Sequence, residues 1–352
     1  MPTIAGEQFH SRMQLNKPKM SSKELVEKMI EKGIDIAPYS KEDIEYYLLN
    51  SNNFFRVCSY RKNYQKYQKG KNKGRYIGLN FDQLKALAIL DMKIRKQVLG
   101  MCIDVEHSLK LYILRDFEES SIDGYRIVQD YYNTPNGVKT ATSIIQKRNS
   151  IYVSELTHKY IYPKETTELF TGSDAQEIEY NVDLPIWAML ELMTFGDLLN
   201  FYFFYYDLKT DPASRPPIPK NVLHKVKNIR NACAHNNCIL NHLKDKSANI
   251  PPAIGEFARR IGLTSSSVSS RLKCSAICEI MCTFYCIDVL ASVPVKQHDL
   301  NKLQEDIQHF YKKYGQLFMP NHLVKSSLDF LKVSVDKLVD MCYNEDVAKK
   351  AL

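Results

Sequence analysis

Helical periodicity is the feature that most constrains how this chain can fold. Apolar residues recur every three and four positions through most of the sequence, whereas the strict alternation of half-buried strands is rare. The longest such pattern runs from Phe81 to Phe117, and others cover 185–206, 219–240 and 268–290. These patterns predict an all-α fold of about eight to ten helices, with the four long patterns forming a four-helix core.

The chain is expected to divide into four parts. Residues 1–20 lack the charged-then-apolar order of a signal peptide and are predicted to be a flexible lead. Residues 21–80 are predicted to form an N-terminal helical and basic segment, and 81–295 the main helical domain. Apolar periodicity weakens over 118–183, where an irregular insertion is expected. Residues 296–352 are predicted to add amphipathic C-terminal helices.

Composition favours a cytoplasmic protein with no membrane partner. With 44% hydrophobic and 25% charged residues, the 352-residue chain is ordinary for a globular protein. No apolar run approaches the roughly 18 to 20 residues that cross a bilayer. The nine cysteines are odd in number and follow no secretory signal, so we expect reduced thiols rather than disulfides.

Four of the cysteines form a ladder with one step every four residues: Cys274, Cys278, Cys282 and Cys286. Each step along a helix advances roughly 6 Å and turns roughly 40°, so four such thiols cannot surround one tetrahedral zinc ion. We therefore predict that they pack as small apolar side chains. No metal and no other cofactor is predicted for this chain.

A basic segment, Arg56 to Arg75, is the strongest local charge signal in a chain with a formal net charge of +8, and it contains no acidic residue. Its candidate RNA-binding residues are Arg56, Tyr60, Arg61, Lys62, Lys66, Lys69, Lys71, Lys73 and Arg75. The cations could neutralise phosphates while tyrosine rings stack on unpaired bases. The segment could equally be a solvated loop between helices, and the sequence leaves both interpretations open.

The stretch NIRNACAHNN, residues 228–237, places an arginine and a histidine five positions apart. A spacing of this kind arises about once by chance in a chain of this composition. Asn231 and His235 share a helix face, whereas Arg230 and His235 are roughly 140° apart in a regular helix. The pair converges only if a helix end intervenes, which the two following asparagines favour, or if both residues flank one cleft. The alternative is that His235 fills a polar core position and Arg230 pairs with an acid.

Four segments, taken in order, resemble a known family. KNIRNACAHNN resembles the R-x4-6-H signature of the HEPN superfamily, with Asn231 as the polar residue after the arginine. LPIWAMLELMTFGDLLNFY is similar to a segment of the bacterial abortive-infection proteins of the AbiD and AbiF type, matching at Pro185, Trp187, Glu191, Phe195 and Gly196. NNFFRVCSYRKNY and the pattern that starts at Phe81 are similar to the same family's upstream segments, with Asp91, Arg95 and Glu106 in place.

The resemblance implies a HEPN-like core and a metal-independent endoribonuclease that acts in abortive infection, a bacterial defence against phage. Arg230, Asn231 and His235 would be its catalytic residues. His235 would act as general base on a ribose 2′-OH or as acid toward the 5′-oxygen, and Arg230 would stabilise charge on the phosphate. Asn231 would orient His235 or the phosphate. The implied products carry a 2′,3′-cyclic phosphate and a 5′-hydroxyl.

Three further expectations concern partners and supporting residues. Since the sequence holds only one such motif, a composite site would need a second copy in a two-fold homodimer. Glu191 would either hold Arg230 across the core, pair with another base, or lie partly exposed. Asp91 and Arg95 are four residues apart and are predicted to form a structural pair.

Two rival functions stay open at the level of sequence. In one, the chain is a non-catalytic RNA-binding module that grips a small structured RNA through its basic segment. In the other, it is a helical interaction protein with no RNA chemistry. Binding a small structured RNA is also compatible with cleaving another RNA, so the first rival differs from the nuclease only in lacking cleavage.

Overall fold

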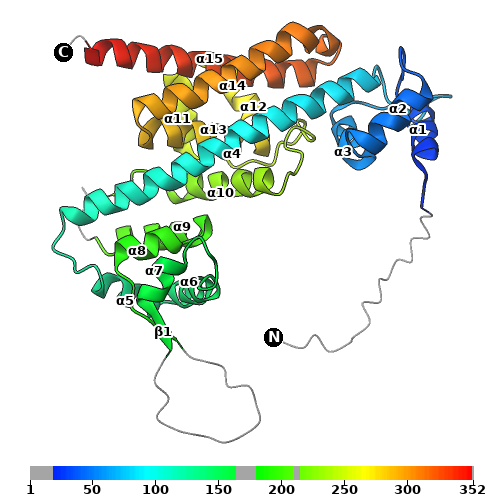
Figure 1. Cartoon of the computed structure of the whole chain (residues 1–352). Helices are drawn as coiled ribbons and strands as arrows, with labels where there is room; N and C mark the ends of the chain where they lie inside the picture. The colour runs from blue at the N-terminus through cyan, green and yellow to red at the C-terminus, as the bar shows by residue number, and fades with distance from the viewer. Residues whose placement is uncertain (1–18, 164–179, 210–214, 351–352) are drawn as a thin grey trace, which may run out of the picture. The chain divides into compact units, whose positions relative to one another are not determined.

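The computed structural model describes residues 19–163, 180–209 and 215–350 (Figure 1). Within them it contains fifteen α-helices and one two-stranded sheet, so the predicted all-α class is confirmed. The helices are more numerous than expected because several long apolar patterns are interrupted. The chain divides into two compact units, one that ends at Lys85 and one that begins at Ala86.

The first unit contains α1 (Ser22–Glu31), α2 (Lys41–Asn50), α3 (Phe54–Ser59), the 3₁₀ helix η1 (Tyr60–Asn63) and the first turn of α4 (Phe81–Glu118). Helices α1 and α2 begin at capping boxes, in which Ser21 and Ser40 exchange hydrogen bonds with the acid three residues later. The Phe81 ring anchors the unit's core, since its centroid lies 5.5 Å from that of Tyr39 and 5.4 Å from that of Tyr47.

The second unit continues α4 and, in its described residues, adds nine α-helices and a short hairpin before the C-terminal pair, α14 and α15. These elements are α5 (Arg126–Tyr132), α6 (Pro135–Gln146), α7 (Ser154–Tyr160), β1 (Ile161–Pro163), β2 (Tyr180–Val182), α8 (Ile186–Leu192), α9 (Phe195–Asp207), α10 (Lys220–Ala234), α11 (Pro252–Arg260), α12 (Ser265–Arg271), α13 (Ser275–Leu290), α14 (Val293–Tyr314), η3 (Gly315–Phe318) and α15 (His322–Lys350). The strands β1 and β2 pair antiparallel, with Ile161 opposite Val182.

Helix α4 runs along α10, α13 and α14 in the second unit (Figure 1). Cys102 on α4 meets Thr283 on α13 at 3.8 Å, and Lys93 on α4 pairs with Asp306 on α14 at 2.7 Å. Helices α10 and α13 pack against each other along their lengths, as do α14 and α15. The core of this unit therefore lies around the middle of α4, beside the end of α10.

Three of the expected long helices are broken. The pattern over 185–206 divides into α8 and α9, because Thr194 is extended and caps α9 with Asp197 in a capping box. The pattern over 219–240 ends as a helix at Ala234. The pattern over 268–290 divides between α12 and α13, and the segment 118–183, expected to be irregular, contains α5, α6 and α7.

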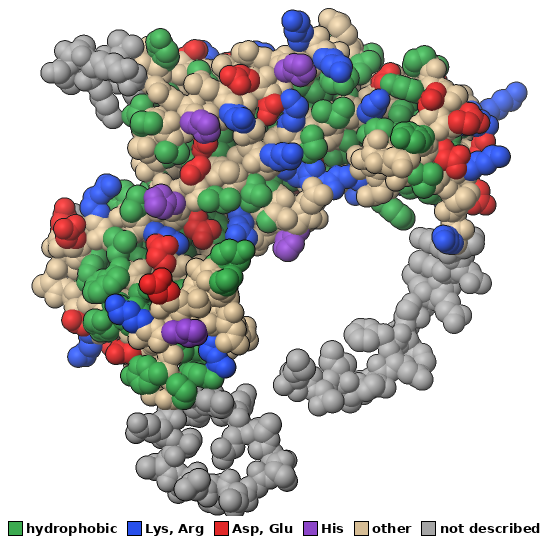
Figure 2. Space-filling model, viewed as in Figure 1, with side chains coloured by type: hydrophobic (Ala, Val, Ile, Leu, Met, Phe, Trp, Pro, Cys, Tyr) green, Lys and Arg blue, Asp and Glu red, His purple; other side chains and the backbone are tan. Residues whose placement is uncertain are grey.

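Hydrophobic side chains gather on the visible surface of the lobe that α5 to α9 form (Figure 2). The exposed residues of this lobe include Tyr125, Ile151, Tyr152, Tyr162 and Trp187. Trp187 is 49% exposed and packs edge-on against Tyr125, with ring centroids 6.1 Å apart. Trp187 is thus a surface residue rather than part of the core.

Candidate active site

The end of α10 presents the candidate catalytic residues. Arg230 and Asn231 lie in its last turns and His235 is its C-cap, with an exposed side chain. Asn236 then adopts a left-handed backbone with φ of 58°. The N–H of Asn236 donates to the carbonyl of Cys233 at 3.0 Å, and the N–H of Asn237 donates to that of Ala232 at 2.8 Å. This is a Schellman ending, so the helix end that the two asparagines predict is confirmed, but it follows His235 and does not separate His235 from Arg230.

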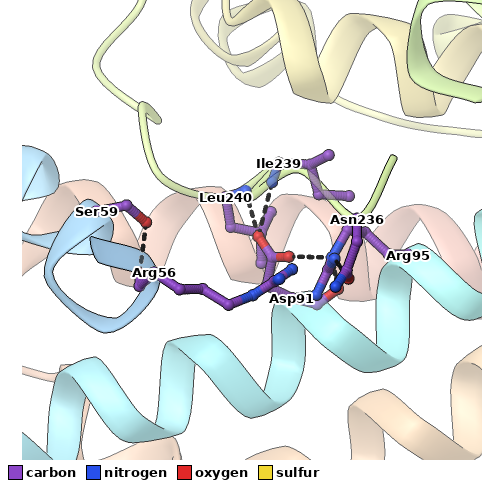
Figure 3. A network of polar contacts seen from close by, with 7 residues as sticks. All are labelled: Arg56, Ser59, Asp91, Arg95, Asn236, Ile239 and Leu240. Atoms are coloured by element: carbon purple, nitrogen blue, oxygen red, sulfur yellow. Dashed lines mark hydrogen bonds and ion pairs between the residues drawn. The ribbon is translucent and has the colours of Figure 1, made fainter. Parts of the chain in front are cut away.

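A buried ion pair on α4 holds the turn that follows His235 (Figure 3). The Nε atom of Arg95 donates to Oδ1 of Asp91 at 2.5 Å, and its Nη1 donates to Oδ1 of Asn236. The second carboxylate oxygen of Asp91 accepts the backbone N–H groups of Ile239 at 2.8 Å and Leu240 at 2.7 Å. Three points of the turn are therefore tied to α4.

The pair is deeply buried, since Asp91 is fully covered and Arg95 is only 4% exposed. Burial raises the pKa of Asp91, while the two backbone donors and the Arg95 guanidinium act against that rise. The predicted structural pair of Asp91 and Arg95 is confirmed. The sequence did not reveal that the pair also positions the chain around His235.

Arg230 keeps unused hydrogen-bonding capacity. Its Nη1 donates to Oδ1 of Asn231 at 3.4 Å, and its Nε is buried with no hydrogen-bond partner among the described residues. Its charge acts on Glu106 of α4, whose pKa is raised by burial and lowered by the nearby Lys110, Arg230 and Lys147. The guanidinium therefore lies near an acid with no direct bond to it among the described residues, and its Nε is enclosed by protein and not open to a ligand.

Asn231 and Glu191 do not make the contacts that would support His235 and Arg230. The amide of Asn231 contacts Arg230, and no hydrogen bond from it to the His235 imidazole occurs in the described part of the chain. Glu191 on α8 is 62% exposed and pairs with Lys110 of α4 at 3.4 Å instead of with Arg230. Of the three alternatives, the structure therefore shows the last two together, a pair with another base and a partly exposed carboxylate, and not a contact that holds Arg230 across the core.

The basic segment forms a closed loop in the first unit. Its two arms are joined where the N–H of Tyr67 donates to the carbonyl of Arg75 at 3.0 Å and the N–H of Gly74 donates to that of Tyr67 at 2.9 Å. The side chains exposed on this loop and at its start are those of Lys62, Lys66, Lys69, Lys71, Lys73 and Arg75. These six cations are available to an anionic partner.

The tyrosines of the segment are less available than expected. Tyr60 is completely buried and Tyr64 is 6% exposed, so neither can stack on a base, and the prediction for Tyr60 is wrong. Both rings are needed in the small core of the first unit. Tyr67 is 42% exposed and is the ring of the loop that a base could reach. Arg56 and Arg61 are partly buried.

The cysteine ladder packs as predicted. Cys274 is 3% exposed, and Cys278, Cys282 and Cys286 are fully covered, all four as free thiols. No group of three or more His, Cys, Asp or Glu side chains within the described residues is arranged to hold a metal ion. Among those residues, likewise, no helix is both long enough and apolar enough to span a bilayer.

A family model described as Abi-like protein matches residues 47–241, more than half of the chain. The chain belongs to the Abi-like protein family. Membership implies a role in abortive infection, the coarser part of the function expected from the sequence. The matched Abi-like region contains the α4 ion pair and the end of α10, whereas α11 to α15 lie beyond it. No curated protein and no solved structure matches the chain significantly.

Proposed function

We propose that this Abi-like protein is a metal-independent endoribonuclease of the HEPN type that acts in anti-phage defence. One observation carries the proposal: His235 is exposed at a helix end whose following turn is fixed by the buried Asp91–Arg95 pair. The contacts of that pair are made to Asn236, Ile239 and Leu240, and they fix the backbone directly after His235. A pre-organised reactive group needs such contacts, because catalysis depends on positioning.

The chemistry requires only groups that the chain itself supplies. His235 takes the proton of a ribose 2′-OH, and the 2′-oxygen attacks the adjacent phosphorus. The bond from phosphorus to the 5′-oxygen breaks, and the leaving oxygen takes up a proton from an imidazolium. The products are a 2′,3′-cyclic phosphate and a 5′-hydroxyl. Arg230, which is half-buried near the end of the same helix, neutralises the charge that develops on the phosphate oxygens.

The attacking 2′-oxygen and the leaving 5′-oxygen lie on opposite sides of the phosphorus, so one fixed imidazole cannot serve as base toward the first and acid toward the second. The sequence contains one Arg-x4-His motif, so we propose that a two-fold homodimer brings two copies together. The exposed loop of Lys66, Lys69, Lys71 and Lys73 would contribute affinity for RNA phosphates.

Cleavage of total RNA by the purified chain tests the proposal. The wild type should produce fragments with 2′,3′-cyclic phosphate ends, and His235→Ala should lower the rate by roughly 10²- to 10⁴-fold. His309→Ala, which removes an exposed histidine on α14, is the matched control and should cleave like the wild type. Unchanged cleavage by His235→Ala would refute the assignment.

The exposed basic loop supports one alternative, a non-catalytic module that binds a small structured RNA. Incubation with total RNA distinguishes the two functions, because such a module leaves the RNA uncut. Its binding to RNA would still be seen in a gel-shift measurement. In that case Arg230 and His235 would only grip phosphate, and the lysines of the loop would determine affinity.

A further inference from the structure

Helices α11 and α12 form a compact pair beyond the region that the family model matches. A four-residue turn, Ile261 to Thr264, joins them. Gly262 adopts a left-handed backbone with φ of 81°, and the N–H of Leu263 donates to the carbonyl of Ala258 at 3.0 Å. Thr264 caps α12 through its side chain. A short turn containing glycine between two such helices is the connection of a helix-turn-helix.

The inner face of the pair is entirely apolar. Its buried residues are Ile254, Phe257, Ala258, Ile261, Leu263, Val268 and Leu272. Helix α11 packs on α13, and α12 packs on α15. Arg271 adds a polar tie, since its Nη1 donates to Oγ of Ser327 on α15 at 3.1 Å. These contacts fix the orientation of α11 and α12, so the opposite face of α12 stays at the surface.

The outer face of α12 is a stripe of hydroxyls. Ser265, Ser266, Ser269 and Ser270 are exposed, at a spacing that puts them on one side of the helix, and the exposed Lys273 follows. Serine is a weaker helix former than alanine or the long straight side chains, so helix stability does not explain this composition. Oγ of Ser269 donates to the carbonyl of Ser266 at 3.1 Å and Oγ of Ser270 to that of Ser267 at 3.2 Å, so these two hydroxyls present acceptors at the surface. No bulky side chain on the stripe prevents close approach.

Charge around the stripe favours an anionic partner. From the start of α11 at Pro252 to Lys273 the chain has four cations, Arg259, Arg260, Arg271 and Lys273, and one acid, Glu256. Arg260 pairs with Asp288 and Arg271 with Ser327, while Arg259 and Lys273 are exposed. Lys337 of α15 lies beside Gly262 at the turn and is also exposed. Three cations thus flank the outer face.

We propose that α11 and α12 are a helix-turn-helix that binds duplex DNA, with α12 entering the major groove. The stripe hydroxyls contact base edges and Arg259, Lys273 and Lys337 contact phosphates. The major groove of B-DNA admits an α-helix, whereas that of A-form RNA is too deep and narrow for side chains to read. DNA also lacks the 2′-OH that serves as nucleophile at the proposed nuclease site, so the two activities are separable.

Selection from a random 30-base-pair duplex DNA library with the full-length protein tests this proposal. The wild type should enrich one sequence and bind it at least about 10³-fold more tightly than a shuffled duplex. Ser266→Glu/Ser270→Glu should abolish that preference, because two carboxylates would face the groove. Ser121→Glu/Asn149→Glu, which adds the same charge at exposed positions elsewhere, should keep it.

Three outcomes would overturn the proposal: no enriched sequence, a preference that survives Ser266→Glu/Ser270→Glu, or tighter binding to an RNA duplex of the same sequence. Circular dichroism of both double variants shows whether they fold. Both substituted pairs are exposed, so native helical content is expected. His235→Ala should retain the DNA preference in full, so loss of RNA cleavage would leave this result unaffected.

Discussion

Asn236 does two things at once at the candidate site. Its left-handed backbone ends α10, which turns the chain away directly after His235. Its side-chain oxygen accepts a hydrogen bond from the buried Arg95. Glycine would fit the backbone without the second contact, and most other residues would be strained there. Asparagine is thus the residue type that serves both the helix ending and the link to α4.

Asp91 is predicted to be the most costly single residue to remove from this network. Asp91→Ala leaves the Arg95 guanidinium buried without its carboxylate and frees two backbone N–H groups. Breaking a buried pair in this way lowers the free energy of unfolding by about 3 to 5 kcal/mol. Urea denaturation monitored by circular dichroism measures the change.

Asp130→Ala is the matched control for that variant. Asp130 also belongs to an ion pair four residues apart in a helix, with Arg126 at 3.5 Å, but its side chain is 50% exposed. Its loss should change the free energy of unfolding by less than about 1 kcal/mol. Equal costs for the two variants would mean that the Asp91 contacts do not hold the turn.

At the residue scale, the sequence predicted what local spacing determines. The helix end after Arg230 and the pairing of Asp91 with Arg95 depend on neighbours along the chain, and both are confirmed. The partners of Glu191 and Asn231 depend on how separate helices approach one another. Spacing carries no information on that approach, so the Lys110 contact of Glu191 was one of several alternatives.

At the scale of helices, some ends are likewise determined by neighbouring residues in the sequence and others by residues far away in the chain. The apolar residues continue through α8 and α9, so apolar periodicity does not reveal the boundary between the two helices. The boundary is marked by the capping box of Thr194 and Asp197 at the start of α9. The N-terminus of α13 has no side-chain cap from Cys274 and is capped from a distance instead. Oδ2 of Asp245 accepts the N–H of Ser275 at 3.2 Å and its hydroxyl at 2.7 Å.

This remote cap predicts a pH dependence. Hydrogen bonds from Ser275 lower the pKa of Asp245 well below its usual range. A carboxyl with a lowered folded pKa adds stability in full above its unfolded pKa of about 3.9, and loses it as pH falls through the folded value. Asp245→Asn should therefore be less stable than the wild type by about 1 kcal/mol at pH 7.

The gap between Asp245→Asn and the wild type should narrow as the pH falls below about 4. Thermal unfolding from pH 7 down to the acid limit of folding measures it. A gap that is constant with pH would show that the carboxylate charge is not what caps α13.

The basic loop makes its own prediction at this scale. Lys69→Ala/Lys71→Ala/Lys73→Ala should weaken RNA binding and reduce the slope of log affinity against log salt by about 2, since each single-strand phosphate contact contributes roughly 0.7. The control Lys139→Ala/Lys302→Ala/Lys312→Ala removes the same charge from exposed positions on α6 and α14. Equal effects of the two triple variants would assign RNA binding to net charge alone.

In the whole molecule, the region that the family model matches contains the proposed nuclease site, and the helices beyond it contain the proposed DNA-binding element. The matched region ends at residue 241, directly after the turn that the Asp91–Arg95 pair holds. The C-terminal helices α11 to α15 pack on this region through α13 and α14, and they bring the proposed helix-turn-helix. The chain would thereby join an RNA-cleaving site and a DNA-binding element within one folded unit, from Ala86 onward.

The proposed homodimer gives a quantitative test of how the cleaving site is built. In a composite site that needs His235 from both copies, only wild-type pairs are active. After subunit exchange, an equal mixture of wild type and His235→Ala should retain about one quarter of the wild-type rate, because one pair in four is fully wild type. A site complete within each subunit would retain about one half.

His309→Ala again provides the control, since its equal mixture with the wild type should keep the full rate. The mixing should be repeated at falling protein concentration, where dissociation of the dimer should lower the rate per subunit. A rate per subunit that is independent of dilution, together with one half in the mixture, would place the whole reaction on a single chain. Arg230 and the exposed His235 imidazole would then have to act on one phosphate without a symmetry mate.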